Sequence, residues 1–210
     1  MSLKHIVHKT HTEKPKRPRR PRPPTRCQSM IQELYSKPLL VFGCGNTLFG
    51  DDGFGPAVIE LLEKQYQLPP QAAVMDVGTS IREFLFDLLI SPQKPRKIII
   101  LDAADQAGRE PGELFEMAVA DISPQKINDF SLHQFPSVNL LQELHTLGGV
   151  EVRVLAVKVG CIPDHVRPGL TPQVAAALPR ACAWVLRQLD TVQPGETPAT
   201  AGPEINAGAC

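Results

Sequence analysis

The stretch Lys97-Ile98-Ile99-Ile100-Leu101-Asp102 is the clearest strand in this sequence. It is a short apolar run dominated by β-branched residues, which is typical of a strand buried on both faces of a parallel sheet. We therefore expect this strand at the centre of the sheet, with other strands on both sides of it.

Four further apolar segments have the length and the boundaries of strands. They cover residues 39–43, 73–77, 113–119 and 150–159, and the weakest of them, 113–119, is expected at an edge of the sheet. Glycine or proline bounds several of these segments, as is usual where a strand ends in a turn.

Helical patterns lie between these strands. In the first helix, Pro56 suits the opening turn, and Val58, Leu61, Leu62 and Tyr66 share one apolar face. At the start of the next helix, Ser80 and Glu83 have the spacing of a capping box. The apolar face of that helix consists of Ile81, Phe84, Leu85 and Leu88. Residues 137–147 form another helix, and the helical region from Thr171 should be kinked or split at Pro179. The alternation predicts a single α/β domain with a mostly parallel twisted sheet of about five strands and helices on both faces.

The two ends of the chain differ in composition from its middle. Residues 1–29 hold nine Lys and Arg against one acidic residue, are rich in proline and show no apolar periodicity, which predicts a disordered basic tail. Residues 193–210 are rich in Pro, Gly, Ala and Thr and predict a second loose tail. The remaining residues, 30–192, are predicted to form the α/β domain.

Composition excludes several classes of protein. The 22 basic and 22 acidic residues balance overall, so the tail of +8 precedes a body of −8 that lacks the positive field favouring nucleic acid. No apolar run approaches the ~20 residues of a membrane-spanning helix. The 5 cysteines are scattered without a Cys-x-x-Cys pair, and no secretory signal is visible. We expect a cytoplasmic protein that binds neither nucleic acid nor membrane.

Chemically suggestive groups follow the predicted strands at one edge of the sheet, where ligands bind in such folds. The loop over residues 43–55 contains Asp51 and Asp52, but it lacks the glycine and lysine spacings of nucleotide-binding loops. One carboxylate, Asp51, is expected to cap the following helix, and Asp52 then requires another role. Asp102 ends the central strand, and His133 lies in a later loop.

Each of these groups alone would ordinarily be a turn, cap or hydrogen-bonded structural residue. Together, Asp52, Asp102 and His133 come from three separate loops at one edge, and they form a plausible nitrogen and oxygen site for a divalent metal. Such ligands suit zinc, nickel or manganese.

Several motifs, taken in order, make the sequence resemble the hydrogenase maturation endopeptidases. They are residues 41–56 with their glycine-asparagine-aspartate motif, Asp76-Val77-Gly78-Thr79, Asp102-Ala103, Ser131-Leu132-His133-Gln134, Val159-Gly160-Cys161-Ile162-Pro163 and Gly169-Leu170-Thr171-Pro172. The resemblance extends over about residues 39–189. It implies a single α/β domain that removes the carboxy-terminal extension of a nickel-iron hydrogenase large-subunit precursor after nickel has been inserted.

The resemblance also implies roles for individual residues. Asp52, Asp102 and His133 are the expected catalytic and metal-contacting positions, although members of the family often have glutamate where this chain has Asp52. Asp76 is expected to orient the substrate, and Gly45 and Asn46 are expected to contact it. The implied partner is the large-subunit precursor. The implied cofactor is a divalent metal, expected to be nickel supplied by the substrate, with zinc or a similar ion as a surrogate; a resident metal is the alternative.

Peptide hydrolysis needs an activated nucleophile and stabilisation of the oxyanion, and a divalent ion that lowers the pKa of bound water towards ~7 supplies both. We assign Asp52 and His133 as ligands, Asp102 as ligand or base, and water as nucleophile. A competing interpretation makes Cys44 the nucleophile with His133 as its base. Another makes the protein a nickel-dependent recognition or chaperone module that binds the precursor without cutting it. A nucleotide-binding regulator is the least favoured, because both phosphate motifs are absent.

Overall fold

The computed structural model describes residues 33–118 and 135–190. The predicted tails 1–29 and 193–210 lie outside these ranges. In chain order the elements are β1 (Leu39–Cys44), the 3-10 turn η1 (Gly50–Gly53), α2 (Phe54–Gln65), β2 (Ala72–Gly78), α3 (Ile81–Ile90), β3 (Lys97–Ala104), β4 (Leu114–Ala118), α4 (Phe135–Thr146), β5 (Glu151–Lys158), α5 (Pro172–Ala175) and α6 (Leu178–Asp190).

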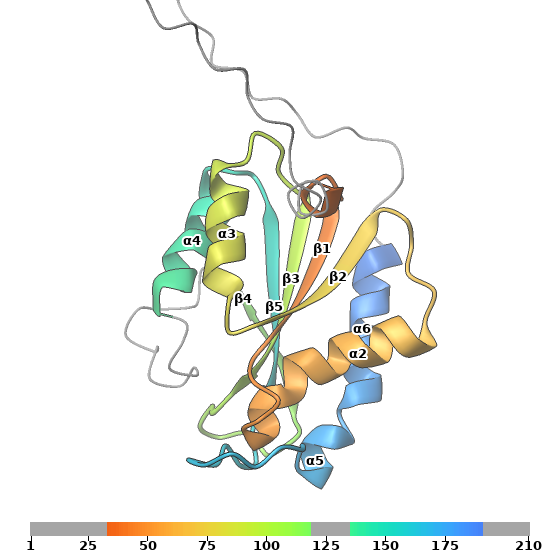
Figure 1. Cartoon of the computed structure of the whole chain (residues 1–210), viewed down its shortest axis with the longest axis vertical. Helices are drawn as coiled ribbons and strands as arrows, with labels where there is room; N and C mark the ends of the chain where they lie inside the picture. Colours follow the sequence, from red (N-terminus) through yellow and green to blue (C-terminus); the bar gives the residue numbers. More distant parts are fainter. Residues whose placement is uncertain (1–32, 119–134, 191–210) are drawn as a thin grey trace, which may run out of the picture.

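The described residues form one five-stranded sheet with the order β2-β1-β3-β5-β4 (Figure 1). The pairs β1–β2, β1–β3 and β3–β5 are parallel, and β4 is antiparallel to β5 at the edge. β3 is thus the central strand, and all eight of its residues are buried, as its apolar run predicts. The predicted fold class and the edge position of β4 are both confirmed.

Helices cover both faces of the sheet (Figure 1). On one face, α2 and α6 pack on alternate residues of the strands, such as Leu39 and Val41 of β1 and Ile99 of β3. On the other face, α3 and α4 pack on the intervening residues, such as Leu40 and Phe42. The period-2 alternation of a strand therefore divides the core into two apolar layers. Within the described part of the chain, no helix is long and apolar enough to cross a membrane.

The strand order places a topological switch point between β1 and β3. β1 connects through α2 to β2 on one side, whereas β3 lies on its other side, so the segments leaving β1 and β3 depart in different directions. A crevice at the carboxyl ends of strands is the usual ligand site at such a point. The loop with Asp52 leaves β1, and β3 carries Asp102, so both candidates belong to this switch point.

Three details of the predicted elements are wrong, whereas the split expected near Pro179 is confirmed. Ser80 precedes α3 but makes no side-chain capping bond, so the capping box does not form. Tyr66 follows α2 in extended conformation and is partly exposed, so it does not extend the buried face. The helical region does split, at residues 176–177 between α5 and α6, and Pro179 lies in the first turn of α6, where proline is tolerated. Asp102 does not end the central strand, because β3 continues to Ala104.

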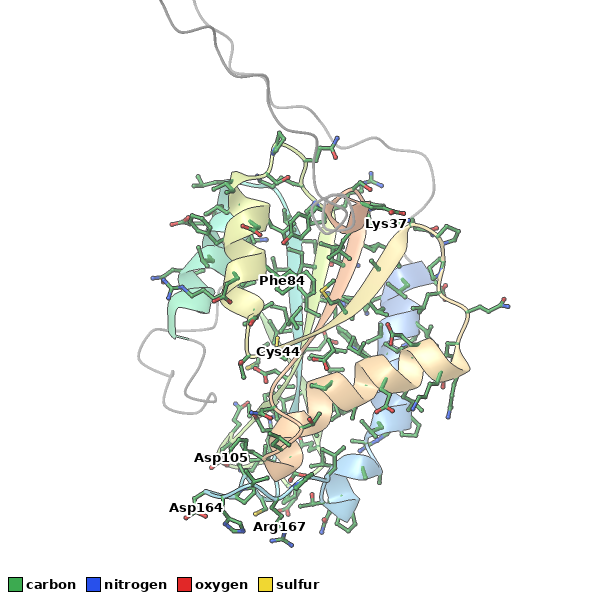
Figure 2. The ribbon with its side chains drawn as sticks, in the orientation of Figure 1. Lys37, Cys44, Phe84, Asp105, Asp164 and Arg167 are labelled. Atoms are coloured by element: carbon green, nitrogen blue, oxygen red, sulfur yellow. The ribbon has the colours of Figure 1, made fainter. Side chains whose placement is uncertain are left out.

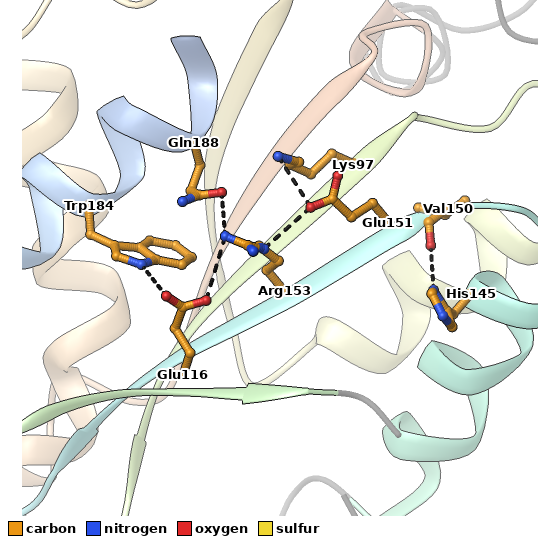
Figure 3. Close-up of polar contacts among 8 residues, drawn as sticks. All are labelled: Lys97, Glu116, His145, Val150, Glu151, Arg153, Trp184 and Gln188. Carbon is orange, nitrogen blue, oxygen red and sulfur yellow. Dashed lines mark hydrogen bonds and ion pairs between the residues drawn. The ribbon is translucent and has the colours of Figure 1, made fainter. Parts of the chain in front are cut away.

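A set of polar contacts fastens α6 to the edge of the sheet (Figure 3). The indole N–H of Trp184 donates to Oε1 of Glu116 on β4 at 2.7 Å. Arg153 of β5 donates to Oε1 of Gln188 at 2.7 Å and lies 3.6 Å from Glu116 Oε2. These contacts tie the antiparallel edge strand to a helix, and such a strand is otherwise the least supported part of a sheet.

We predict that Trp184→Phe lowers the free energy of unfolding by about 1 to 2 kcal/mol, because Glu116 loses a hydrogen bond and a smaller ring leaves a gap. Urea unfolding followed by far-UV circular dichroism measures the change. The matched variant Glu116→Gln keeps an acceptor for the indole and loses only a partly exposed ion pair, so its effect should stay below about 0.5 kcal/mol. Equal losses in both variants would contradict this assignment.

Candidate active site

The turn that carries Asp52 lies unusually close to the strands, because glycines remove the side chains that would block it. A Cβ on Gly55 would lie 2.3 Å from the carbonyl oxygen of Cys44 and 2.5 Å from that of Leu101. A Cβ on Gly43 would meet the carbonyl oxygen of Gly55 at 2.6 Å. The start of α2 therefore rests directly on the backbones of β1 and β3, and η1 contacts β3.

Asp52 lies in η1 and is 5% exposed. Its Oδ2 accepts a hydrogen bond from the backbone N–H of Asn46 at 2.8 Å, which ties the carboxylate to the loop leaving β1. Gly45 adopts φ +121°, and a Cβ there would lie 1.8 Å from the backbone carbonyl oxygen of Asp52. Gly45 is thus required for the close approach of this turn, whether or not it also contacts a substrate as predicted.

Asp102 is fully buried in β3, with 0% exposure, and its Oδ1 accepts a hydrogen bond from the backbone N–H of Ala103 at 2.8 Å. It follows Leu101, the partner of Gly43 in the pairing of β3 with β1. Asp102 therefore sits beside the end of β1. A buried carboxylate is costly unless it is compensated, which makes it a candidate functional group rather than a simple turn residue.

Asp76 is the third carboxylate at this end of the sheet. It is exposed, pairs with Gly43 of β1 in the sheet register, and accepts a hydrogen bond from the N–H of Gly78 at 2.9 Å. Asn46, the other predicted substrate contact, is partly buried, and its Oδ1 accepts from the N–H of Leu48 at 3.0 Å. Both side chains shape the turns that leave the strands.

The buried thiol of Cys44 lies close enough to Asp52, Asp76 and Asp102 for their charges to affect its pKa. Burial raises the pKa of Cys44 well above its ordinary value, and the charges of Asp102, Asp76 and Asp52 raise it further. Figure 2 shows Cys44 at the end of β1. These three carboxylates belong to three different elements, η1, β2 and β3. A thiol in these surroundings stays protonated, which argues against Cys44 as a nucleophile.

His133, the predicted third ligand, lies outside the described residues. Among residues 33–118 and 135–190, no group of three or more His, Cys, Asp or Glu side chains could hold a metal ion. The described part of the predicted triad is the pair Asp52 and Asp102. Their oxygen atoms are suitable donors for a divalent cation, but they make up only part of a ligand set.

Asp51 does not have its predicted role. Neither η1 nor α2 has a side-chain cap, and the Asp51 carboxylate instead bonds to Gly160, Cys161 and Thr171, far away in the sequence. The sequence contains only a weak signal of this role. Asp51 and Asp52 are adjacent, and a helix cap would use only one of the two carboxylates. The hydrogen-bond partners of Asp51 could not be found from local spacing.

The fold and this site define an α/β protein with a carboxylate-lined site at the switch point of its sheet. Comparison with known proteins identifies the family. A family model described as hydrogenase maturation protease matches residues 56–188. The chain therefore belongs to the hydrogenase maturation protease family, a family of peptidases, and the resemblance seen in the sequence is confirmed.

Individual relatives agree with this assignment. A Methanocaldococcus jannaschii protein, provisionally named a hydrogenase maturation protease, is 37% identical over 159 residues, covering 73% of this chain and 97% of the relative. The hydrogenase 2 maturation protease of Escherichia coli is 31% identical, covering 72% of this chain and 90% of the relative. The solved structure of the Escherichia coli hydrogenase maturating endopeptidase HybD is similar with a TM-score of 0.60 and 29% identity, covering 72% of this chain and 91% of that one.

We predict that Gly45→Ala displaces the Asp52 turn and lowers the free energy of unfolding by about 3 kcal/mol, because the backbone conformation is strained and the new Cβ collides with a carbonyl. Thermal unfolding measures the loss. Gly108→Ala is the matched control, since Gly108 also has positive φ, at +80°, but nothing lies within 4 Å of its Cβ position. It should lose only about 1 kcal/mol. A Gly45→Ala protein as stable as the control would contradict the close approach.

We predict that the thiols differ sharply in reactivity. Cys161 is exposed, whereas Cys44 is buried with a raised pKa, so less of Cys44 is thiolate at any given pH. Iodoacetamide at pH 8, followed by peptide mass spectrometry, should alkylate Cys161 in the folded protein and leave Cys44 unmodified until the chain is unfolded. Alkylation of Cys44 at the rate of Cys161 would restore the thiol mechanism.

Proposed function

We propose that this protein is an endopeptidase that removes the carboxy-terminal extension of a nickel-iron hydrogenase large-subunit precursor after nickel insertion. The observation that carries the proposal is the placement of Asp52, Asp76 and Asp102 on η1, β2 and β3 around the switch point of the sheet, in a chain that belongs to the hydrogenase maturation protease family. We also place the reaction in the cytoplasm, with no nucleic acid or membrane as partner.

The negative charge of the site supports selection of a metal-loaded precursor. Carboxylates held in a low-dielectric setting repel one another, and a divalent cation brought by the substrate would relieve that repulsion. A nickel-free precursor offers no such compensation. In this proposal nickel is part of the substrate, and Asp52, Asp102 and His133 recognise it together. A resident metal remains the alternative for the same three residues.

The same groups then serve hydrolysis. Asp52 and His133 are proposed to hold the nickel end of the precursor, which fixes the scissile peptide at the switch point. Asp102 is proposed as a further ligand or as the base that takes a proton from the attacking water. Asp76, Gly45 and Asn46 are proposed to contact the peptide around the scissile bond. Holding the peptide against the water accounts for most of the expected rate difference between loaded and empty precursor.

The decisive experiment incubates the purified protein with nickel-loaded and nickel-free precursor and weighs the products by mass spectrometry. We expect cleavage of the loaded precursor alone. Asp52→Asn, Asp102→Asn and His133→Ala should each reduce the rate by on the order of 100-fold or more, because each removes a charge or a proton acceptor at the reacting centre.

Asp105→Asn is the matched control. Asp105 is an exposed carboxylate near the same end of β3, ion-paired with Lys158, and its substitution should change the rate by less than about threefold. Efficient cutting of nickel-free precursor would overturn the recognition of nickel. Tight binding of loaded precursor without any cleavage would instead establish the non-cleaving recognition module.

A further inference from the structure

Asp51 is a buried charge that the proposed chemistry does not use. It is 0% exposed, yet its carboxylate accepts four hydrogen bonds. Oδ2 accepts from the backbone N–H of Gly160 at 2.7 Å, from the backbone N–H of Cys161 at 2.9 Å and from the hydroxyl of Thr171 at 3.0 Å. Oδ1 accepts from the backbone N–H of Thr171 at 2.6 Å. All the donors belong to residues 160–171, which we call the anchoring segment.

Further backbone bonds join the anchoring segment to the loop of Asp52. The N–H of Asp51 donates to the carbonyl of Cys161 at 3.1 Å, and the N–H of Gly50 donates to that of Arg167 at 2.9 Å. The N–H of Arg167 in turn donates to the carbonyl of Leu48 at 2.8 Å. The first two residues of η1, Gly50 and Asp51, are therefore held by a segment more than 100 residues further on in the sequence.

The neighbouring carboxylates bond to different parts of the chain. Asp51 bonds to the anchoring segment, whereas Asp52 accepts from the N–H of Asn46 in the loop leaving β1. The short turn is thus fastened to two independent supports. Because Asp51 and Asp52 are joined by one peptide bond in a tight turn, a displacement of the backbone at Asp51 also displaces the backbone that carries Asp52.

We propose that Asp51 is a positioning residue, whose buried carboxylate holds η1 on the anchoring segment and so sets the orientation of Asp52 for cleavage. The proposal deepens the proposed function and rests on it. A carboxylate is required because three backbone N–H groups donate to it, and a backbone N–H cannot act as a hydrogen-bond acceptor. Asp51→Asn keeps the shape but places an NH₂ group against at least one of them, which leaves a buried donor unsatisfied.

The test measures kcat and KM of Asp51→Asn on nickel-loaded precursor, well below its unfolding temperature and per folded molecule. A misplaced Asp52 should lower kcat by on the order of tenfold to a hundredfold, with KM changed by less than about threefold. A merely structural Asp51 would lower the unfolding temperature and leave the kcat of the folded molecules unchanged. Asp164→Asn, the same change at an exposed position of the anchoring segment, should have wild-type kcat.

Hydrogen exchange supplies a readout that needs no substrate. The amide of Asn46 donates to Asp52, so its exchange should accelerate in Asp51→Asn if Asp52 moves, whereas Asp164→Asn should leave it unchanged. If Asp51→Asn does not fold, Thr171→Val carries the test, because it removes only the hydroxyl bond. It should raise Asn46 exchange and lower kcat by about twofold to fivefold.

Two results would overturn the positioning role. One is a folded Asp51→Asn protein with wild-type kcat and wild-type Asn46 exchange, and the other is the same outcome in Thr171→Val where Asp51→Asn is unfolded. Failure of the proposed function is a separate result, in which the wild-type protein does not cleave loaded precursor at all. In that case the exchange of Asn46 still decides whether Asp51 orients Asp52.

Discussion

The close approach of the start of α2 to the carboxyl ends of β1 and β3 is the constraint on which the rest of the site depends. It is possible only because Gly43 and Gly55 have no side chains, since a Cβ at either position would lie within 2.6 Å of backbone oxygen atoms. The helix therefore begins in contact with two strand backbones. The turn before the helix therefore lies against β3 at the switch point, and Asp52 is buried in that turn.

Burying this turn removes water from the carboxylates of Asp51 and Asp52, and the structure compensates each of them differently. Asp51 accepts four hydrogen bonds, so donors from one distant segment replace the water that its carboxylate loses on burial. Asp52 and Asp102 each accept a backbone N–H, but their charges also act on Cys44 together with that of Asp76. The first arrangement builds a rigid support. The second places acidic side chains together at the switch point, which is the property that the proposed recognition of a nickel-bearing precursor requires.

Much of the fold could be predicted from the sequence because strands and helices produce recognisable local periodicity. The run Lys97–Asp102 gave the central strand, and the alternation of elements gave the sheet and its two helical layers. Predictions that relied on a single residue were weaker. Ser80 has the spacing of a capping box without making the bond, and Tyr66 has the spacing of the apolar face of α2 but lies beyond the end of that helix. Such choices depend on a few tenths of a kcal/mol to about 1 kcal/mol, which tertiary packing easily outweighs.

By itself, the sequence determined the α/β class, the central strand, the family resemblance and the edge of the sheet at which Asp52 and Asp102 lie, because each of these follows from patterns within short windows. The sequence also separated a structural Asp51 from a functional Asp52, but only the tertiary structure decided what Asp51 supports and how Asp52 comes to be buried. The partners of Asp51 lie 109, 110 and 120 residues away, and the burial of Asp52 depends on glycines packed against two strands. Hydrogen bonds between segments so far apart leave no periodic trace in either segment, so they become visible only once the chain has folded.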